Sequence, residues 1–339
     1  MGKISYLFQI GRNMDFKEMF QTTVDIAEKT NKSKIKVFLD IIYCGLKYQA
    51  GYTDYKLFAM YELNKKQRKT IITRGINNEL IKKYNNPKYI KYFSSKIEFN
   101  MKFNKFLKRD WLELEPDEES LALFKSFAYK HHQIVAKTLS ISCGEGVEII
   151  SVNRRNSKEV FDMLISTNRT LVEEVAKECE ELKKLHPSSL NTIRVITLNK
   201  EIVAAFLKIG NNNNVVDNFN FDGLVVPINI STGIVDYLAI NKEGELFKEH
   251  PLTHEQILWF SIPKWKQVKS FIAKVCEVVP EVKYVGWDVA IDKEPYLIKG
   301  NYFPEHVLYQ LPPHRTDGIG LLKEFNKVIE KEKEKWNYI

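Results

Sequence analysis

The spacing of apolar residues changes partway along the chain, and this change limits the folds that the chain can adopt. Over residues 15–114, apolar side chains recur three and four positions apart, as in an amphipathic helix. The clearest example contains Ile35, Phe38, Ile41, Ile42 and Leu46. From residue 134 onward, the apolar residues form short β-prone runs between polar segments. The pattern predicts an α+β protein with an all-helical lobe over residues 1–114 and mixed lobes over residues 115–339.

Local periodicity also predicts individual elements within this outline. Helices are expected at residues 54–63, 96–107, 120–131, 157–165, 264–278 and 321–335. Strands are expected at residues 134–137, 147–152, 171–174, 192–198, 202–209, 224–228, 233–238, 284–291 and 296–299. The polar run 211–214 is predicted to be a turn, because asparagine tolerates left-handed backbone angles.

Composition narrows the classes of protein to which the chain can belong. Lys and Arg number 51 against 43 Asp and Glu, and the net charge of +8 favours anionic ligands such as nucleotides or acidic sugars. The sequence lacks the repeat of basic and aromatic residues that is typical of nucleic-acid binding. Its apolar runs are all shorter than the ~18 residues of a membrane span. The four cysteines form no CxxC pair, as expected for reduced thiols. We expect a cytoplasmic protein that binds neither nucleic acid nor membrane; its oligomeric state stays open.

A lysine at the end of a predicted strand is the first candidate for chemistry. Lys137 precedes a loop of small residues that contains Ser142, Gly144 and Gly146. Backbone N–H groups in such a loop can surround phosphate oxygens, and the lysine would neutralise their charge. A plain hairpin would explain the same glycines, so both interpretations stay open.

Three further polar residues lie on predicted strands. Asp288 and Asn301 belong to neighbouring strands, and Mg²⁺ prefers oxygen ligands of this kind. A hairpin with one cap residue is the alternative. Arg194 lies on an apolar strand, where a charge is costly unless it is paired. It is expected to meet either an internal carboxylate or an anionic ligand.

Taken in order along the chain, these segments resemble the ATP-grasp superfamily. Within it, the chain is similar to the sugar-transfer-associated ATP-grasp proteins found near polysaccharide assembly genes. The segments that carry the resemblance begin at Cys44, Gly51, Lys96, Arg109, Lys137, Asn191, Val216, Gly286, Gly300 and Tyr309. The resemblance implies two α+β lobes that clamp a nucleotide, preceded by the helical lobe.

The resemblance also implies a reaction, two cofactors and a set of site residues. ATP, with Mg²⁺, would phosphorylate a carboxylate to an acyl phosphate, which the amine of a second small molecule then attacks. The product would be an amide in polysaccharide or small-peptide biosynthesis. The implied residues are Lys96, Lys137, Ser142, Gly144 and Gly146 at the ATP phosphates, Glu173 and Glu174 at the adenine hinge, Asp288 and Asn301 at Mg²⁺, Arg194 at the transferring phosphoryl group, and Asn218 and His314 at the acceptor.

The chain departs from the family pattern at two important positions. Lys299 replaces the glutamate that normally precedes the Gly-Asn pair, and a charged lysine cannot ligate Mg²⁺. Glu145 replaces a lysine in the phosphate loop. Three hypotheses therefore stay open: a ligase that uses one Mg²⁺ or Lys299 as a substitute cation, a degenerate protein that binds nucleotide, glycan or a partner without ligation, and an altered ATP-driven condensation. Glu305 and Asp292 are the nearby carboxylates that could replace the lost ligand, and Glu305 is favoured because it follows the strand of Asn301.

Overall fold

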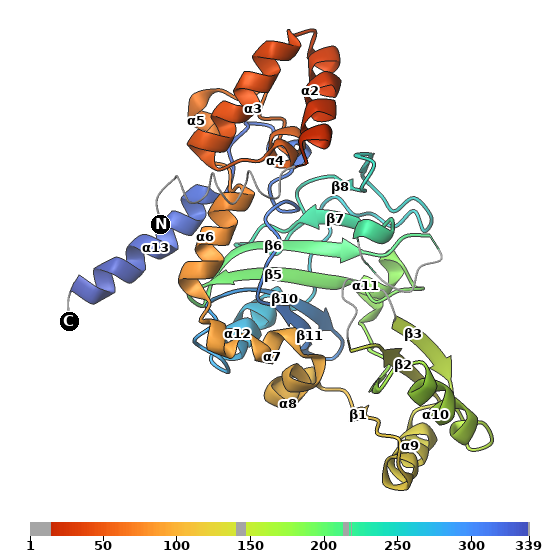
Figure 1. Ribbon diagram of the computed structural model, residues 1–339. Coiled ribbons are helices and arrows are strands. Elements are labelled where there is room, and N and C mark those ends of the chain that lie inside the picture. The colour runs from red at the N-terminus through yellow and green to blue at the C-terminus, as the bar shows by residue number, and fades with distance from the viewer. Residues whose placement is uncertain (1–14, 140–146, 213–216, 218, 338–339) are drawn as a thin grey trace. The chain divides into compact units, whose positions relative to one another are not determined.

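The computed structural model describes residues 15–139, 147–212, 217 and 219–337, and the chain forms two compact units (Figure 1). The first unit comprises Met1–Asn85 and Pro304–Ile339, and the second comprises Asn86–Phe303. The division of the chain at residue 114 into a helical lobe and mixed lobes stays a prediction.

The described part of the first unit is helical. Its first helix begins after Asp15, whose carboxylate accepts hydrogen bonds from two N–H groups of the first turn, and ends at Asn31 in the left-handed conformation. The helices enclose a hydrophobic core in which Cys44, Tyr55 and Met60 are fully buried. The elements are α2 (Phe16–Thr30), α3 (Lys34–Tyr48), α4 (Tyr52–Leu57), α5 (Lys65–Arg68), α6 (Arg74–Tyr84), η3 (Pro312–His314) and α13 (Leu322–Asn337).

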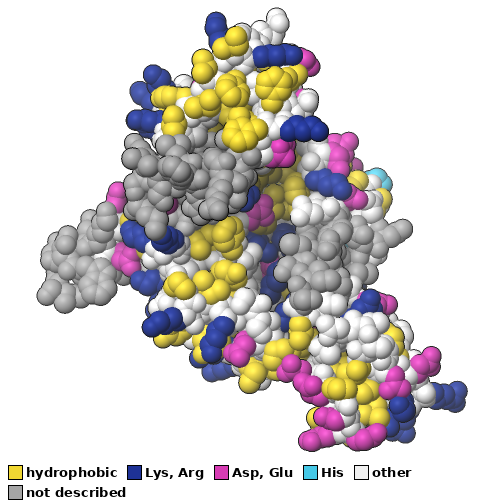
Figure 2. Space-filling view, in the orientation of Figure 1, with side chains coloured by type: hydrophobic (Ala, Val, Ile, Leu, Met, Phe, Trp, Pro, Cys, Tyr) yellow, Lys and Arg dark blue, Asp and Glu magenta, His cyan; other side chains and the backbone are white. Residues whose placement is uncertain are grey.

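Helix α3 confirms the clearest helical prediction, but only part of the predicted apolar set lies in the core. The core contacts come from Val37, Ile41 and Cys44, which lie along one stripe. Ile35 and Leu46 of the predicted apolar set are exposed instead. Figure 2 shows hydrophobic side chains gathered on the surface of these N-terminal helices. Periodicity predicted the helix, whereas packing decided which of its apolar residues are buried.

The second unit contains a smaller sheet, which among the described residues has the strand order β1-β4-β2-β3 with antiparallel neighbours. Helices α9 (Glu118–Lys130) and α10 (Ser157–Ser166) contribute Phe124 and Leu164 to its core. The strands are β1 (Trp111–Glu113), β2 (Gln133–Lys137), β3 (Val147–Ser151) and β4 (Leu171–Glu174).

The larger sheet of this unit has the order β11-β10-β5-β6-β7-β8-β9 and is antiparallel throughout its described strands. Phe93 and Phe103 pack their rings on Trp287 of the sheet. The strands are β5 (Thr192–Leu198), β6 (Glu201–Ile209), β7 (Leu224–Pro227), β8 (Ala239–Ile240), β9 (Leu246–Phe247), β10 (Tyr284–Ile291) and β11 (Pro295–Asn301). The remaining elements are η1 (Pro87–Tyr89), α7 (Lys91–Ser94), α8 (Lys96–Leu107), α11 (Glu180–Leu185), η2 (Phe219–Phe221) and α12 (Trp265–Val275).

Three local predictions were wrong. Residues 233–238 form no strand beyond an isolated bridge at Ile234, because Gly233 has a φ of 79° and turns the chain. The helix predicted at residues 54–63 ends at Leu57, and Ala59 has a positive φ. Strand β1 interrupts the all-helical pattern expected up to residue 114, because it pairs with the distant β4. Among the helices described, none is both long and apolar enough to cross a membrane.

Candidate functional site

Asp288 lies at the centre of a charged cluster on one face of the larger sheet. It is the register partner of Arg194 on β5 and of Lys299 on β11, so the three side chains share a face. Arg194 binds the carboxylate with two hydrogen bonds, Nε to Oδ1 at 2.5 Å and one terminal nitrogen to Oδ2 at 2.9 Å. The Lys299 ammonium lies 3.8 Å from Oδ2. Arg194, predicted to meet a carboxylate or an anionic ligand, therefore meets a carboxylate.

A further ion pair, which we did not predict from the sequence, adjoins this cluster. The Lys208 Nζ on β6 lies 2.8 Å from Asp217 Oδ1 and 4.0 Å from Asp288 Oδ1. Asp217 also accepts hydrogen bonds from the backbone and hydroxyl of Thr192. The signal available in the sequence was a lysine inside an otherwise apolar strand, since such a charge requires a partner.

These contacts set the protonation of the cluster. Burial acts to raise the pKa of Asp288, but Arg194, Lys208 and Lys299 outweigh it and hold the pKa well below its ordinary value. Asp288 acts to raise the pKa of Lys299, yet the partial loss of hydration within the cluster and the neighbouring Arg194 and Lys208 together lower it, although half of the side chain is exposed. The carboxylate is therefore ionised, and the surrounding cations repel one another.

The two predicted Mg²⁺ ligands are already engaged by protein donors. Both oxygens of Asp288 accept from Arg194, and Asn301 Oδ1 accepts the N–H of Phe303 at 2.9 Å. A divalent cation at Asp288 would lie among Arg194, Lys208 and Lys299, which would repel it. The residues present at Asp288 and Asn301 do not fit a metal ion.

Glu173 on β4 holds a second buried group of charges. Its Oε2 lies 2.8 Å from Arg109 Nε and 2.6 Å from Lys137 Nζ, and its Oε1 accepts from Asn100 at 3.0 Å. Burial acts to raise the pKa of Glu173, but Lys137 and then Arg109 hold it well below the ordinary value. Arg109 also donates to the carbonyls of Leu297 and residue 298 at 2.6 and 3.1 Å. It thereby joins the smaller sheet to β11.

The irregular pairing of β10 with β11 lies where Arg109 reaches the larger sheet. Asp288 pairs with Lys299 but the next residue, Val289, pairs with Leu297, so residue 298 is the extra residue of a β-bulge. A bulge re-aims neighbouring backbone groups. Here the carbonyl of residue 298 is one of the two that Arg109 binds.

Lys96 connects the two charged groups electrostatically. It is the first residue of α8, and its ammonium donates to the carbonyl of Thr138, next to Lys137. Burial, Lys137 and then Lys299 lower the pKa of Lys96. The ammonium of Lys96 therefore lies beside the end of β2 that carries Lys137. The roles suggested for Lys96 and Lys137 at the ATP phosphates stay predictions.

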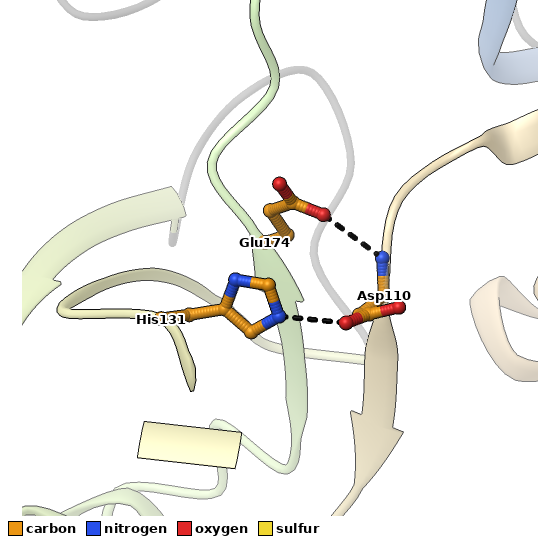
Figure 3. Close-up of side chains that lie close together, drawn as sticks. All are labelled: Asp110, His131 and Glu174. Carbon is orange, nitrogen blue, oxygen red and sulfur yellow. Dashed lines mark hydrogen bonds and ion pairs between the residues drawn. The ribbon is translucent and has the colours of Figure 1, made fainter. Parts of the chain in front are cut away.

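Glu174 lies on the same strand as Glu173 but in a different environment (Figure 3). Its carboxylate accepts the backbone N–H of Asp110 at 3.3 Å, and the Asp110 carboxylate lies 2.7 Å from Nε2 of His131. Ligand atoms of these three residues lie within 4.8 Å of one another. Lys130 also pairs with Asp110 and, together with His131, lowers the pKa of that carboxyl. The group is thus held by ion pairs with protein cations.

The structure does not place several predicted residues relative to these groups. Asn218 and the loop residues Ser142, Gly144 and Gly146 lie outside the described residues. His314 ends η3 and is buried, and it belongs to the first unit, as does Glu305. The roles suggested for these residues stay predictions.

Comparison with solved structures finds ATP-grasp ligases at low sequence identity. An ATP-grasp ligase PsnB complexed with precursor peptide PsnA2 and AMPPNP is 11% identical with a TM-score of 0.37, and the match covers 65% of this chain and 53% of that one. D-alanyl-alanine synthetase A from Vibrio cholerae is 11% identical with a TM-score of 0.44, over 73% and 66%. D-alanine–D-alanine ligase from Bacillus anthracis is 12% identical with a TM-score of 0.36, over 78% and 68%. The chain thus spans about half the length of the PsnB structure that it matches.

No curated protein matches the chain. A family model described as sugar-transfer associated ATP-grasp matches residues 75–329, well over half of the sequence. This range includes both sheets and both charged groups. The match confirms the resemblance and, with it, the ATP-grasp fold. The chain belongs to the sugar-transfer associated ATP-grasp family.

Proposed function

We propose that this chain is an ATP-dependent ligase that joins a small carboxylate to a small amine through an acyl phosphate. The single observation that supports this most is the hydrogen bond from Lys96 of α8 to the carbonyl of Thr138, which brings its ammonium beside the end of β2 that carries Lys137, in the unit that also carries Lys299. Neighbouring lysines can bind the phosphates of a nucleotide, because each ammonium neutralises the charge of a phosphate oxygen. Family membership supports ATP as the nucleotide.

In the proposed reaction, the carboxylate oxygen attacks the γ-phosphorus of ATP and the bond to the ADP oxygen breaks. The amine nitrogen then attacks the acyl carbon, the bond to phosphate breaks, and the nitrogen loses a proton to give the amide. Lys96, Lys137 and Lys299 would neutralise the charge that gathers on the phosphates. We place the reaction in polysaccharide or small-peptide biosynthesis and the protein in the cytoplasm.

Nucleotide binding is the first test of this proposal. Isothermal titration calorimetry with ATP should give saturable binding, and Lys96→Ala should weaken it by about tenfold or more, the loss of one charge-assisted contact. Lys102→Ala is the matched control, since Lys102 lies on the same helix and is exposed. The absence of ATP binding, or equal effects of the two substitutions, would overturn the proposal.

Hydroxylamine trapping tests the chemical step without knowledge of the amine. With ATP, hydroxylamine and a panel of amino acids and sugar acids, an acyl phosphate would be converted to a hydroxamate, which is measured by its colour with iron(III). Hydroxamate and ADP formed together with one carboxylate would support ligation. ATP binding without hydroxamate from any carboxylate would instead support the alternative below.

The alternative function is nucleotide, glycan or partner binding without ligation. A specific observation favours it: the carboxylate predicted to ligate Mg²⁺, Asp288, is bound by Arg194 and approached by Lys299. A protein that has lost its metal site could retain the ATP-grasp scaffold for recognition.

A further inference from the structure

Three strands of the larger sheet each place a cation at Asp288. Arg194 on β5 contacts both carboxylate oxygens, Lys208 on β6 lies 4.0 Å from Oδ1, and Lys299 on β11 lies 3.8 Å from Oδ2. Asp217 is the second carboxylate of the group. Three cationic side chains therefore face two carboxylates, which leaves one positive charge in excess.

The neighbouring group around Glu173 adds to this excess. Arg109 and Lys137 share the one Glu173 carboxylate, and Lys96 donates to the carbonyl of Thr138, the residue after Lys137. The two groups are joined through Arg109, which binds the β11 carbonyls of the two residues before Lys299. The described charges of this region thus favour a polyanion and disfavour an additional cation.

The exposure of the side chains indicates which cation meets solvent. Arg194 and Asp288 are 9% and 3% exposed, whereas Lys299 is 51% exposed. Figure 2 shows that Lys and Arg side chains reach the surface on this face of the molecule. Lys299 can therefore reach a ligand at the surface while Arg194 keeps Asp288 neutralised from within.

We propose that this chain binds the phosphates of ATP directly through Lys299 and the cations beside it, with no divalent metal ion between protein and phosphate. This proposal rests on the proposed nucleotide binding and specifies its chemistry. Lys299 would supply the positive charge that a bound metal ion would otherwise supply. Arg194 and Lys208 would hold Asp288 so that its carboxylate does not repel the nucleotide.

The test compares ATP binding by calorimetry in excess EDTA and in excess Mg²⁺. The dissociation constants should agree within about threefold. Lys299→Glu should weaken binding in EDTA by about tenfold or more, because it replaces the attractive charge by a repulsive one, and Mg²⁺ should restore part of the loss. Lys293→Glu is the control, since Lys293 lies at the exposed turn of the same hairpin and makes the same change in net charge. Circular dichroism checks that both variants are folded.

Each outcome separates this proposal from the proposed function. Binding in Mg²⁺ but more than about tenfold weaker binding in EDTA would overturn metal-independent binding and leave nucleotide binding intact. Another outcome is that ATP binds equally well in both buffers while Lys299→Glu weakens this binding no more than Lys293→Glu does. That result would overturn the proposal that the phosphates bind at this cluster. No binding in either buffer would overturn both proposals. If Lys299→Glu is unfolded, Lys299→Met, which removes the charge alone, should weaken binding in EDTA by several-fold.

Discussion

Removal of the charge of Glu173 should destabilise the second unit more than any substitution of an exposed acidic residue. The side chain is 4% exposed, and its Oε2 is the shared acceptor of Arg109 and Lys137, which are 3% and 18% exposed. Glu173→Gln keeps the shape and the contact with Asn100 but leaves two cations without a counter-charge. Loss of one partner from a buried ion pair costs about 3–5 kcal/mol, and we expect a loss in this range.

Urea unfolding followed by circular dichroism, without nucleotide, measures this loss. Glu174→Gln is the matched control, because Glu174 is the next residue on β4 but pairs with Lys177, which is 72% exposed. This substitution should lower the free energy of unfolding by less than about 1 kcal/mol. The double variant Glu173→Gln/Lys137→Met removes one uncompensated charge and should recover part of the loss. Equal costs for Glu173→Gln and Glu174→Gln would refute the reasoning.

Three further predictions concern pH, thiol reactivity and backbone strain. Burial raises the pKa of Glu178 from 4.5 to about 8, so the native state binds this proton more tightly than the unfolded state does. The free energy of unfolding should therefore fall as the pH rises from about 5 to about 8. Glu178→Gln should flatten this dependence, as measured by urea unfolding. Burial raises the thiol pKa of Cys44 to about 12 and of Cys276 to about 11, so mass spectrometry after iodoacetamide at pH 8 should find both alkylated only in urea, and alkylation of the native protein would contradict their burial. Gly233 and Gly244 both have positive φ, but a Cβ at Gly233 would lie 2.5 Å from the Trp265 indole, whereas a Cβ at Gly244 would meet nothing within 4 Å. Thermal unfolding should therefore show that Gly233→Ala destabilises the protein by about 1–3 kcal/mol more than Gly244→Ala. Equal costs would show that the indole moves aside.

The elements that carry the candidate site could be predicted because their patterns are local. β4, β5 and β10 have the bounds expected from short apolar runs between polar turns. The region of residues 233–238 shows the limit of this reasoning. Its composition suits a strand, but one glycine with positive φ turns the chain before a strand can form.

The partners of the charged residues could not be read from such patterns. The sequence predicted that Arg194 requires a carboxylate or an anion, but its partner Asp288 lies 94 positions away. Asp288 and Asn301 were predicted as metal ligands from their residue types. The register of β10 against β5 and β11 instead brings cations to Asp288.

The sequence by itself determined the succession of helices and strands, the α+β class and the family. Local spacing of apolar residues decides the elements and the class, because burial requires a helix or strand to present one continuous apolar face. The family was indicated by the order of the motif segments along the chain. Only the tertiary structure decided the charges at the site. Strand register and the bulge after Asp288 brought Arg194, Lys208 and Lys299 around one carboxylate, and Coulomb interactions at these distances depend on position in space and not on separation along the chain.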